Sequence, residues 1–144
     1  MQTSRMDKVL LVAGAGLFLA GLLQGGIVDR FTNPRMALSA HLTAVQCGTA
    51  LMVVGGIWQA VSLSRPFAAF ARWSIIAGMV GLWAGLTLAA VSGASRVLPF
   101  AGAGFAAEPA TETLVAALIL LSSGAMIGGW LVLLVGLVRS RDAP

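Results

Sequence analysis

The side chains best suited to chemistry in this chain are one histidine and one cysteine, which lie in the same apolar segment. His41 and Cys47 both stand in NPRMALSAHLTAVQCGTALMVVGG, residues 33–56. On a helix, six residues separate two side chains by about 120° around the axis, so the pair does not form a Cys–His dyad on one face. A thiol surrounded by apolar groups is inert, and packing is therefore one interpretation of Cys47.

His41 is the one side chain of this segment that ligates metals well and titrates near neutral pH. An ionisable residue inside a membrane span is rare and usually functional. One His and one Cys are too few for a zinc site, whereas haem brings four nitrogens and needs only an axial imidazole. Ala44 and Gly48 follow His41 on its own helical face. This bare surface suits either a flat macrocycle or the close packing of another helix.

The elements that must position these residues are four apolar runs. Of the 144 residues, 58% are hydrophobic and 10% are charged, whereas soluble domains have about 25% charged residues. The runs are residues 9–28, 37–61, 73–91 and 113–138. Each is long enough to cross about 30 Å of hydrocarbon as a helix. We therefore predict one all-α domain over residues 1–144, an integral membrane four-helix bundle, with His41 about one turn inside the second helix.

The charged residues lie outside the four runs and predict the orientation. Arg5, Lys8, Arg65, Arg72, Arg139 and Arg141 fall on one side, and Arg30, Arg35 and Arg96 on the other. This excess of positive charge predicts that both termini are cytoplasmic. The first run is long for a signal peptide and lacks a clear cleavage motif, so we expect it to be retained. The scattered cations argue against a nucleic-acid partner, and the uncharged spans argue against an ion channel or transporter.

Glycine spacing predicts close contacts between helices. Pairs of glycines stand four residues apart in three runs, a spacing that lets helix backbones approach each other, within the bundle or between subunits. The pairs are Gly21 and Gly25, Gly81 and Gly85, and Gly124 and Gly128.

The longest loop, residues 92–110, is apolar and contains two prolines. We expect it to lie in the membrane interface or to fold back as a lid over a cavity. Pro109 and Glu112 open the last run, and a proline followed by an acid is typical of a helix N-terminus. We therefore expect Glu112 to cap the last helix.

Several of these segments resemble the hydroxylaminobenzene mutases, which are small four-span bacterial membrane proteins. The likeness covers nearly the whole chain, and four segments carry it most clearly. They are MQTSR at the start, NPRMALSAHL at residues 33–42, LAAV at residues 88–91, and EPATETL at the start of the last helix. More distantly, AHLTAVQCG is similar to the corresponding segment of the styrene oxide isomerases, which are also four-span membrane isomerases.

The resemblance implies an isomerase that converts an aryl hydroxylamine to 2-aminophenol by moving oxygen from nitrogen to the ortho carbon. In the styrene oxide isomerases the histidine that matches His41 ligates haem b at a subunit interface of a trimer, where ferric iron acts as a Lewis acid. By extension we expect His41 to be the axial ligand of haem b, and the protein to be a homotrimer in the bacterial inner membrane that takes a small aromatic substrate.

The same resemblance gives the candidate site residues. Those of the pocket are Cys47, Gln46 and Thr43. Ala44 and Gly48 are candidates for the surface against haem, and Arg35 and Arg96 for ion pairs with its propionates.

The chain departs from both families at several positions. They have Asn at the position of Cys47, and Asn and Tyr in the third helix, where this chain has Val80 and Leu82. The third run offers only Ser74, Thr87 and its tryptophan indoles as polar groups, and we expect its Trp83 to serve in packing. A group that orients the substrate oxygen is then missing. Two alternatives follow: a haem-binding sensor or carrier that does not isomerise, and a cofactor-free scaffold.

Overall fold

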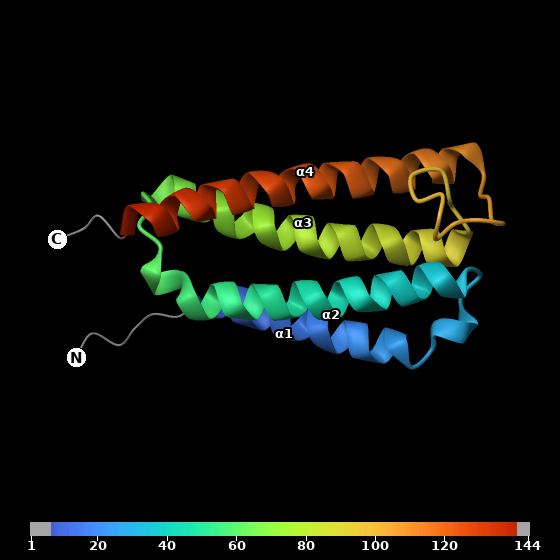
Figure 1. The fold of residues 1–144 in the computed structure, drawn as a ribbon, viewed down its shortest axis with the longest axis horizontal. Helices are drawn as coiled ribbons and strands as arrows, with labels where there is room; N and C mark the ends of the chain where they lie inside the picture. Colours follow the sequence, from blue (N-terminus) through green and yellow to red (C-terminus); the bar gives the residue numbers. More distant parts are fainter. Residues whose placement is uncertain (1–6, 141–144) are drawn as a thin grey trace.

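The computed structural model describes residues 7–140, and within them the chain forms four long helices and no strand. These are α1 (Lys8–Gly25), α2 (Pro34–Ile57), α3 (Arg65–Ser92) and α4 (Pro109–Arg139), with short 3₁₀ turns η1 (Val28–Arg30) and η2 (Trp58–Ala60). Successive helices run in opposite directions, so the start of α1 and the end of α4 lie at the same end of the bundle (Figure 1). Each helix is long and apolar enough to span a membrane. The all-α four-helix prediction is confirmed.

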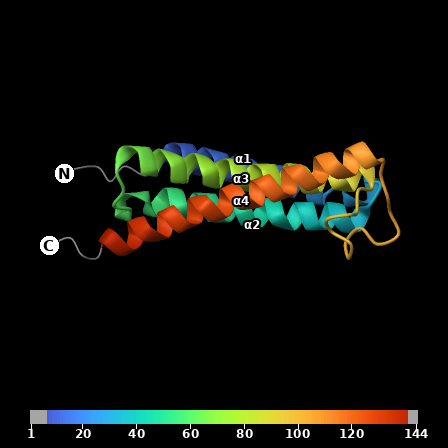
Figure 2. The ribbon, with the colours of Figure 1, turned by 90° about the horizontal axis from the view of Figure 1, so that it is seen from above.

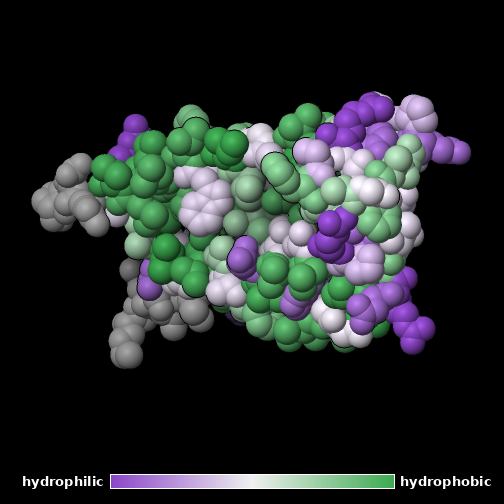
Figure 3. All heavy atoms as spheres, turned by 45° about the vertical axis from the view of Figure 1, so that its right-hand side comes forward, coloured by the Kyte–Doolittle hydropathy of each residue, from purple (hydrophilic) through white to green (hydrophobic). Residues whose placement is uncertain are grey.

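The four helices pack as two pairs. α1 packs along α2, α3 packs along α4, and contacts between α2 and α3 join the pairs. Figure 2 shows the same bundle from above. Apolar side chains cover most of the visible surface, and hydrophilic ones gather mainly at the end that carries the 93–108 loop (Figure 3). This surface suits a bundle whose middle faces lipid.

Two of the three predicted glycine pairs do bring helices together within the bundle. An added Cβ at Gly21 would lie 2.8 Å from the Cβ of Ala44, and one at Gly85 would lie 2.8 Å from Ile119. The third pair does not act in this way, because Gly124 has no atom within 4 Å of an added Cβ. Glycine spacing alone cannot tell a helix face that meets a neighbour from one that faces outward.

The helix ends differ from the ends of the apolar runs. α1 stops at Gly25 rather than at residue 28, α2 begins at Pro34, and α3 begins at Arg65, eight residues before the run that marks it. The reason is that caps set helix ends, whereas hydropathy reports only the segment that crosses hydrocarbon. The Asn33 carboxamide oxygen, for instance, accepts the backbone N–H of Met36 at 3.1 Å and so starts α2.

The long loop folds back onto the bundle. Asn33 is fully buried, and its side-chain nitrogen donates to the carbonyl of Ala101 at 2.9 Å. The Arg35 guanidinium donates to the carbonyl of Ala103. Val97 and Leu98 pack against a buried cluster of α2, α3 and α4 residues. The loop therefore covers this end of the bundle.

Glu112 does not cap α4, which corrects the prediction from sequence. Its carboxylate accepts the backbone N–H groups of Ser95 at 3.0 Å, Arg96 at 3.0 Å and Ala107 at 3.2 Å. Those amides belong to the loop, where they have no helical partner, and a buried carboxylate satisfies all three at once. Glu112 thus clamps the loop that precedes its own helix.

Candidate active site

The His41 imidazole lies against the last turn of α1. It stands two turns into α2, about 10 Å from the start of that helix and deeper than the sequence predicts, because α2 begins at Pro34. Its Nδ1 is 2.7 Å from the carbonyl oxygen of Gly21. An added Cβ at Gly25 would lie 2.8 Å from both Nδ1 and Cε1 of the ring. The missing side chain of Gly25 therefore makes room for the imidazole.

The contact with Gly21 determines which ring nitrogen of His41 is available. A backbone carbonyl can only accept, so Nδ1 must carry the proton and donate it. In the neutral imidazole, Nε2 then holds the lone pair. Metal-ligating histidines are usually held in this way, with the second ring nitrogen donating to a carbonyl or carboxylate. His41 is half-buried, and it has the tautomer that a single axial ligand requires.

Ala44 and Gly48, the small residues next to His41 on its face, pack against α1. Both are buried, and an added Cβ at Gly48 would lie 2.6 Å from the backbone nitrogen of Phe18. This is the close helix packing that the sequence left open as one use of these residues. Their contact with a cofactor stays a prediction.

The three pocket candidates of α2 do not share one environment. Cys47 is buried in the core cluster that also contains Leu17 of α1 and Met79 of α3. Thr43 is half-buried and Gln46 is exposed. Cys47 therefore lies in the interior, whereas Gln46 points away from it. The catalytic role of these residues stays a prediction.

Gln24 of α1, a residue with no role predicted from the sequence, forms a polar network inside the bundle. It is only 5% exposed. Its side-chain nitrogen donates to Thr87 Oγ1 at 3.1 Å, and its oxygen accepts the indole N–H of Trp83 at 2.7 Å. Trp83 thus does more than pack. The signal for Gln24 was available, since an amide side chain in an apolar span usually has a specific partner.

The network and His41 meet at the same turn of α1. Gln24 lies between Gly21 and Gly25, the two glycines that contact the imidazole. The turn that orients His41 from α1 is therefore itself held by α3. Together these residues form one polar layer across three helices, and α3 does supply hydrogen-bonding groups to it.

Arg35 and Arg96, the predicted partners of haem propionates, are both exposed at the end of the bundle nearest His41. Arg35 already donates to the Ala103 carbonyl, and the backbone of Arg96 is held by Glu112. Their binding of propionates stays a prediction. Within residues 7–140, no three His, Cys, Asp or Glu residues gather into a group that could chelate an ion.

Comparison with known proteins shows which family the chain belongs to. The model of the styrene oxide isomerase family matches residues 6–138. Hydroxylaminobenzene mutase HabA of Ectopseudomonas oleovorans is 32% identical over 135 residues, which cover 93% of this chain and 100% of the relative. Hydroxylaminobenzene mutase HabB of the same organism is 36% identical over 124 residues, 85% of this chain and 76% of the relative. No solved structure matches the chain.

Proposed function

We infer a specific reaction from one premise, that this chain belongs to the styrene oxide isomerase family and is a multi-pass membrane isomerase. The reaction we propose is the rearrangement of an aryl hydroxylamine to a 2-aminophenol. The oxygen leaves nitrogen and joins the ortho carbon, while the proton of that carbon passes to nitrogen. Substrate and product have the same atoms, and no external reductant is consumed. The names of both mutase relatives support this substrate class.

The proposed cofactor is haem b, with Nε2 of His41 as its axial ligand. The observation that carries this proposal is the hydrogen bond from His41 Nδ1 to the Gly21 carbonyl, because it presents Nε2 in the ligating tautomer. When bound, ferric haem would supply a Lewis acid that polarises the N–O bond.

Residues of the chain orient the His41 imidazole and keep water from the reacting bond. The Gly21 carbonyl orients Nδ1 of His41, and Gly25 leaves space for the ring. Gln24 and Thr87 hold that turn of α1 in register with α3. The apolar helices around this layer admit an aromatic substrate from the bilayer and keep bulk water away from the reacting bond.

The remaining assignments complete the proposal. Thr43, Gln46 and Cys47 are the candidates for contact with the substrate, and Arg35 and Arg96 for contact with the propionates. The half-buried imidazole leaves part of its surface to a neighbouring subunit, in keeping with a homotrimer that holds haem between subunits. We place this assembly in the bacterial inner membrane with both termini in the cytoplasm.

The test compares three forms of the purified, detergent-solubilised chain: wild type, His41→Gly, and the control Thr49→Ala on the exposed side of α2. We expect a Soret band in the wild type and the control, and conversion of hydroxylaminobenzene to 2-aminophenol without added reductant. His41→Gly should lose both, and added imidazole should restore the band.

Three results would each reject part of this proposal. Full activity of a folded His41→Gly variant would exclude axial ligation as the basis of catalysis. A Soret band without isomerisation would favour a sensor or carrier. The absence of any Soret band after expression with haem supplied would exclude the cofactor.

A further inference from the structure

A groove lies on the surface between the start of α3 and the last turns of α4, at the end of the bundle farthest from His41. Its volume is about 310 Å³, at the lower end of the range for ligand sites. Five of its six lining side chains are apolar and the sixth is a cation. They are Leu63, Phe67, Leu131, Val132, Val135 and Arg139. The groove is therefore apolar with one charged end.

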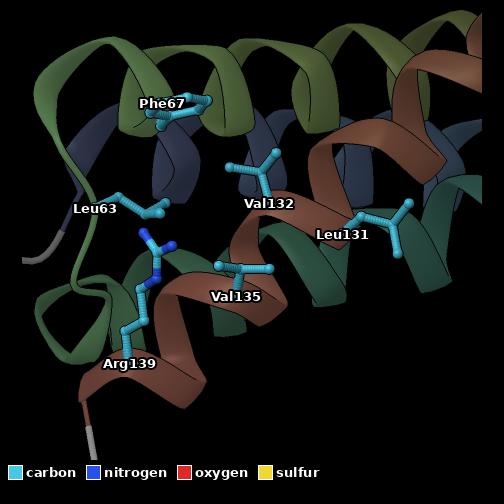
Figure 4. A pocket seen from close by; sticks show the side chains of 6 residues that line it. All are labelled: Leu63, Phe67, Leu131, Val132, Val135 and Arg139. Carbon is cyan, nitrogen blue, oxygen red and sulfur yellow. The ribbon is translucent and has the colours of Figure 1, made fainter. Parts of the chain in front are cut away.

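Figure 4 shows how the charge is placed. Arg139 projects from the last turn of α4 toward Leu63, while Leu131 and Val135 line the same helix farther from its end. Arg139 follows Leu131 by eight positions, which is about 12 Å along the helix axis. A ligand that fills the groove would thus place its polar part at the helix end and its apolar part toward the middle of the span.

The connection between α2 and α3 gives the groove a fixed wall. The backbone N–H of Ser62 donates to the carbonyl of Gly136 at 3.0 Å. An added Cβ at Gly136 would lie 2.6 Å from Val61 and 2.7 Å from Leu63. Because the glycine allows this close approach, Leu63 is held over α4 as one side of the groove.

The surroundings of the groove identify its occupant. Only 22% of the most apolar stretch of α4 is buried within the bundle, so most of this helix lies on the surface of the chain. Among residues 7–140, this end of the bundle carries four cations, namely Lys8, Arg65, Arg72 and Arg139. Of the acids that the structure describes, one lies at this end, Asp7, and it is paired with Arg72 at 3.2 Å. The local charge therefore favours an anion.

We propose that this groove binds an anionic phospholipid. The Arg139 guanidinium contacts the phosphate, for which its planar fork of donors is well suited. A zwitterionic lipid has the same phosphate, but its choline cation offsets the charge and repels the cations at this end. One acyl chain lies along Leu131 and Val135. Basic sites between helices near the membrane surface bind anionic headgroups on the same principle. This inference does not depend on haem or on the proposed reaction.

The experiment measures lipid retention by native mass spectrometry of the full chain released from detergent micelles. Phosphatidylglycerol and phosphatidylcholine with identical acyl chains are offered at equal concentration. We expect phosphatidylglycerol to be retained about fivefold more, as one well-placed basic residue near the membrane surface implies. Arg139→Gln should abolish that preference. Arg65→Gln, an exposed cation at the same end but outside the groove, should keep it.

A second pair of variants tests the apolar part. Val135→Trp fills the groove and should reduce retention of both lipids. Val138→Trp adds the same indole on an exposed position outside the groove and should not. Equal retention of the two lipids by the wild type would overturn the proposal. So would identical behaviour of Arg139→Gln and Arg65→Gln, or of the two tryptophan variants.

Discussion

At the scale of single residues, His41 is oriented by a backbone carbonyl and by the absence of a side chain. Its residue type alone marks it for function, because it is the one histidine in an apolar chain. Its partner Gly21 could not be predicted in the same way, since every residue has a carbonyl and only the register of two helices decides which one is near. Side chains that can do chemistry can thus be recognised in a sequence, whereas the backbone groups that orient them cannot.

Substituting Gly25 tests this arrangement directly. In Gly25→Ala the new methyl group would lie 2.8 Å from the imidazole, so the ring must shift. We expect an altered Soret band and a loss of turnover of about a hundredfold, as small displacements of catalytic groups often cause. The control is Gly16→Ala on the same helix, where an added Cβ meets no atom within 4 Å. An unchanged spectrum and rate in Gly25→Ala would mean that the glycine does not position His41.

For Cys47 we predict an effect on stability rather than on the position of His41. Its sulfur is part of the apolar core, and six residues of helix place it about 9 Å along the axis from His41. We expect Cys47→Ala to cost about 1 kcal/mol of stability through the lost packing, and the turnover of the same variant decides whether the thiol also contacts the substrate. Steady-state rates and thermal unfolding of the same preparation measure the two effects. Loss of turnover in a stably folded variant would establish the thiol as a pocket residue.

At the scale of elements, the number and type of helices could be predicted and their ends could not. The apolar runs locate each span, yet α3 starts eight residues earlier than its run, because the helix includes two cations, Arg65 and Arg72, that the apolar run excludes. The role of Glu112 could not be predicted either. Its hydrogen-bond partners lie in the loop before α4, and no local sequence pattern specifies the path of that loop. Contacts between α1 and α3 are few, and a hydrogen-bond network rather than a wide packed surface joins them.

The Gln24 network should therefore show measurable coupling between α1 and α3. Gln24→Leu removes the partner of Thr87 Oγ1 and leaves the Trp83 indole N–H unpaired, whereas Thr87→Val removes one hydrogen bond. We expect each to destabilise, and the pair to be coupled by about 0.6 kcal/mol and at most about 1.7 kcal/mol. Unfolding in mixed micelles measures the double-mutant cycle. Thr49→Val serves as control, because that hydroxyl bonds within its own helix. Strictly additive effects would show that the hydrogen bond contributes nothing.

At the scale of the whole molecule, the two ends of the bundle differ in charge. The end that holds the start of α1 and the end of α4 has four described cations and one acid. The opposite end has three of each, with Asp29, Glu108 and Glu112 offsetting Arg30, Arg35 and Arg96. The polar layer around His41 lies toward this neutral end, and the groove at Arg139 lies at the cationic one. The cationic end is the one that the positive-inside rule places in the cytoplasm.

This asymmetry yields a prediction about the membrane orientation. In a Cys47→Ala background, one new cysteine is placed in the loop between α2 and α3 as Ser62→Cys, or in the opposite loop as Ala103→Cys, both at exposed positions. A membrane-impermeant maleimide should label the second variant in intact cells and the first only after the membrane is opened. Labelling of Ser62→Cys alone in intact cells would reverse the orientation. The cationic groove would then face the outer leaflet, and His41 would lie near the cytoplasmic surface.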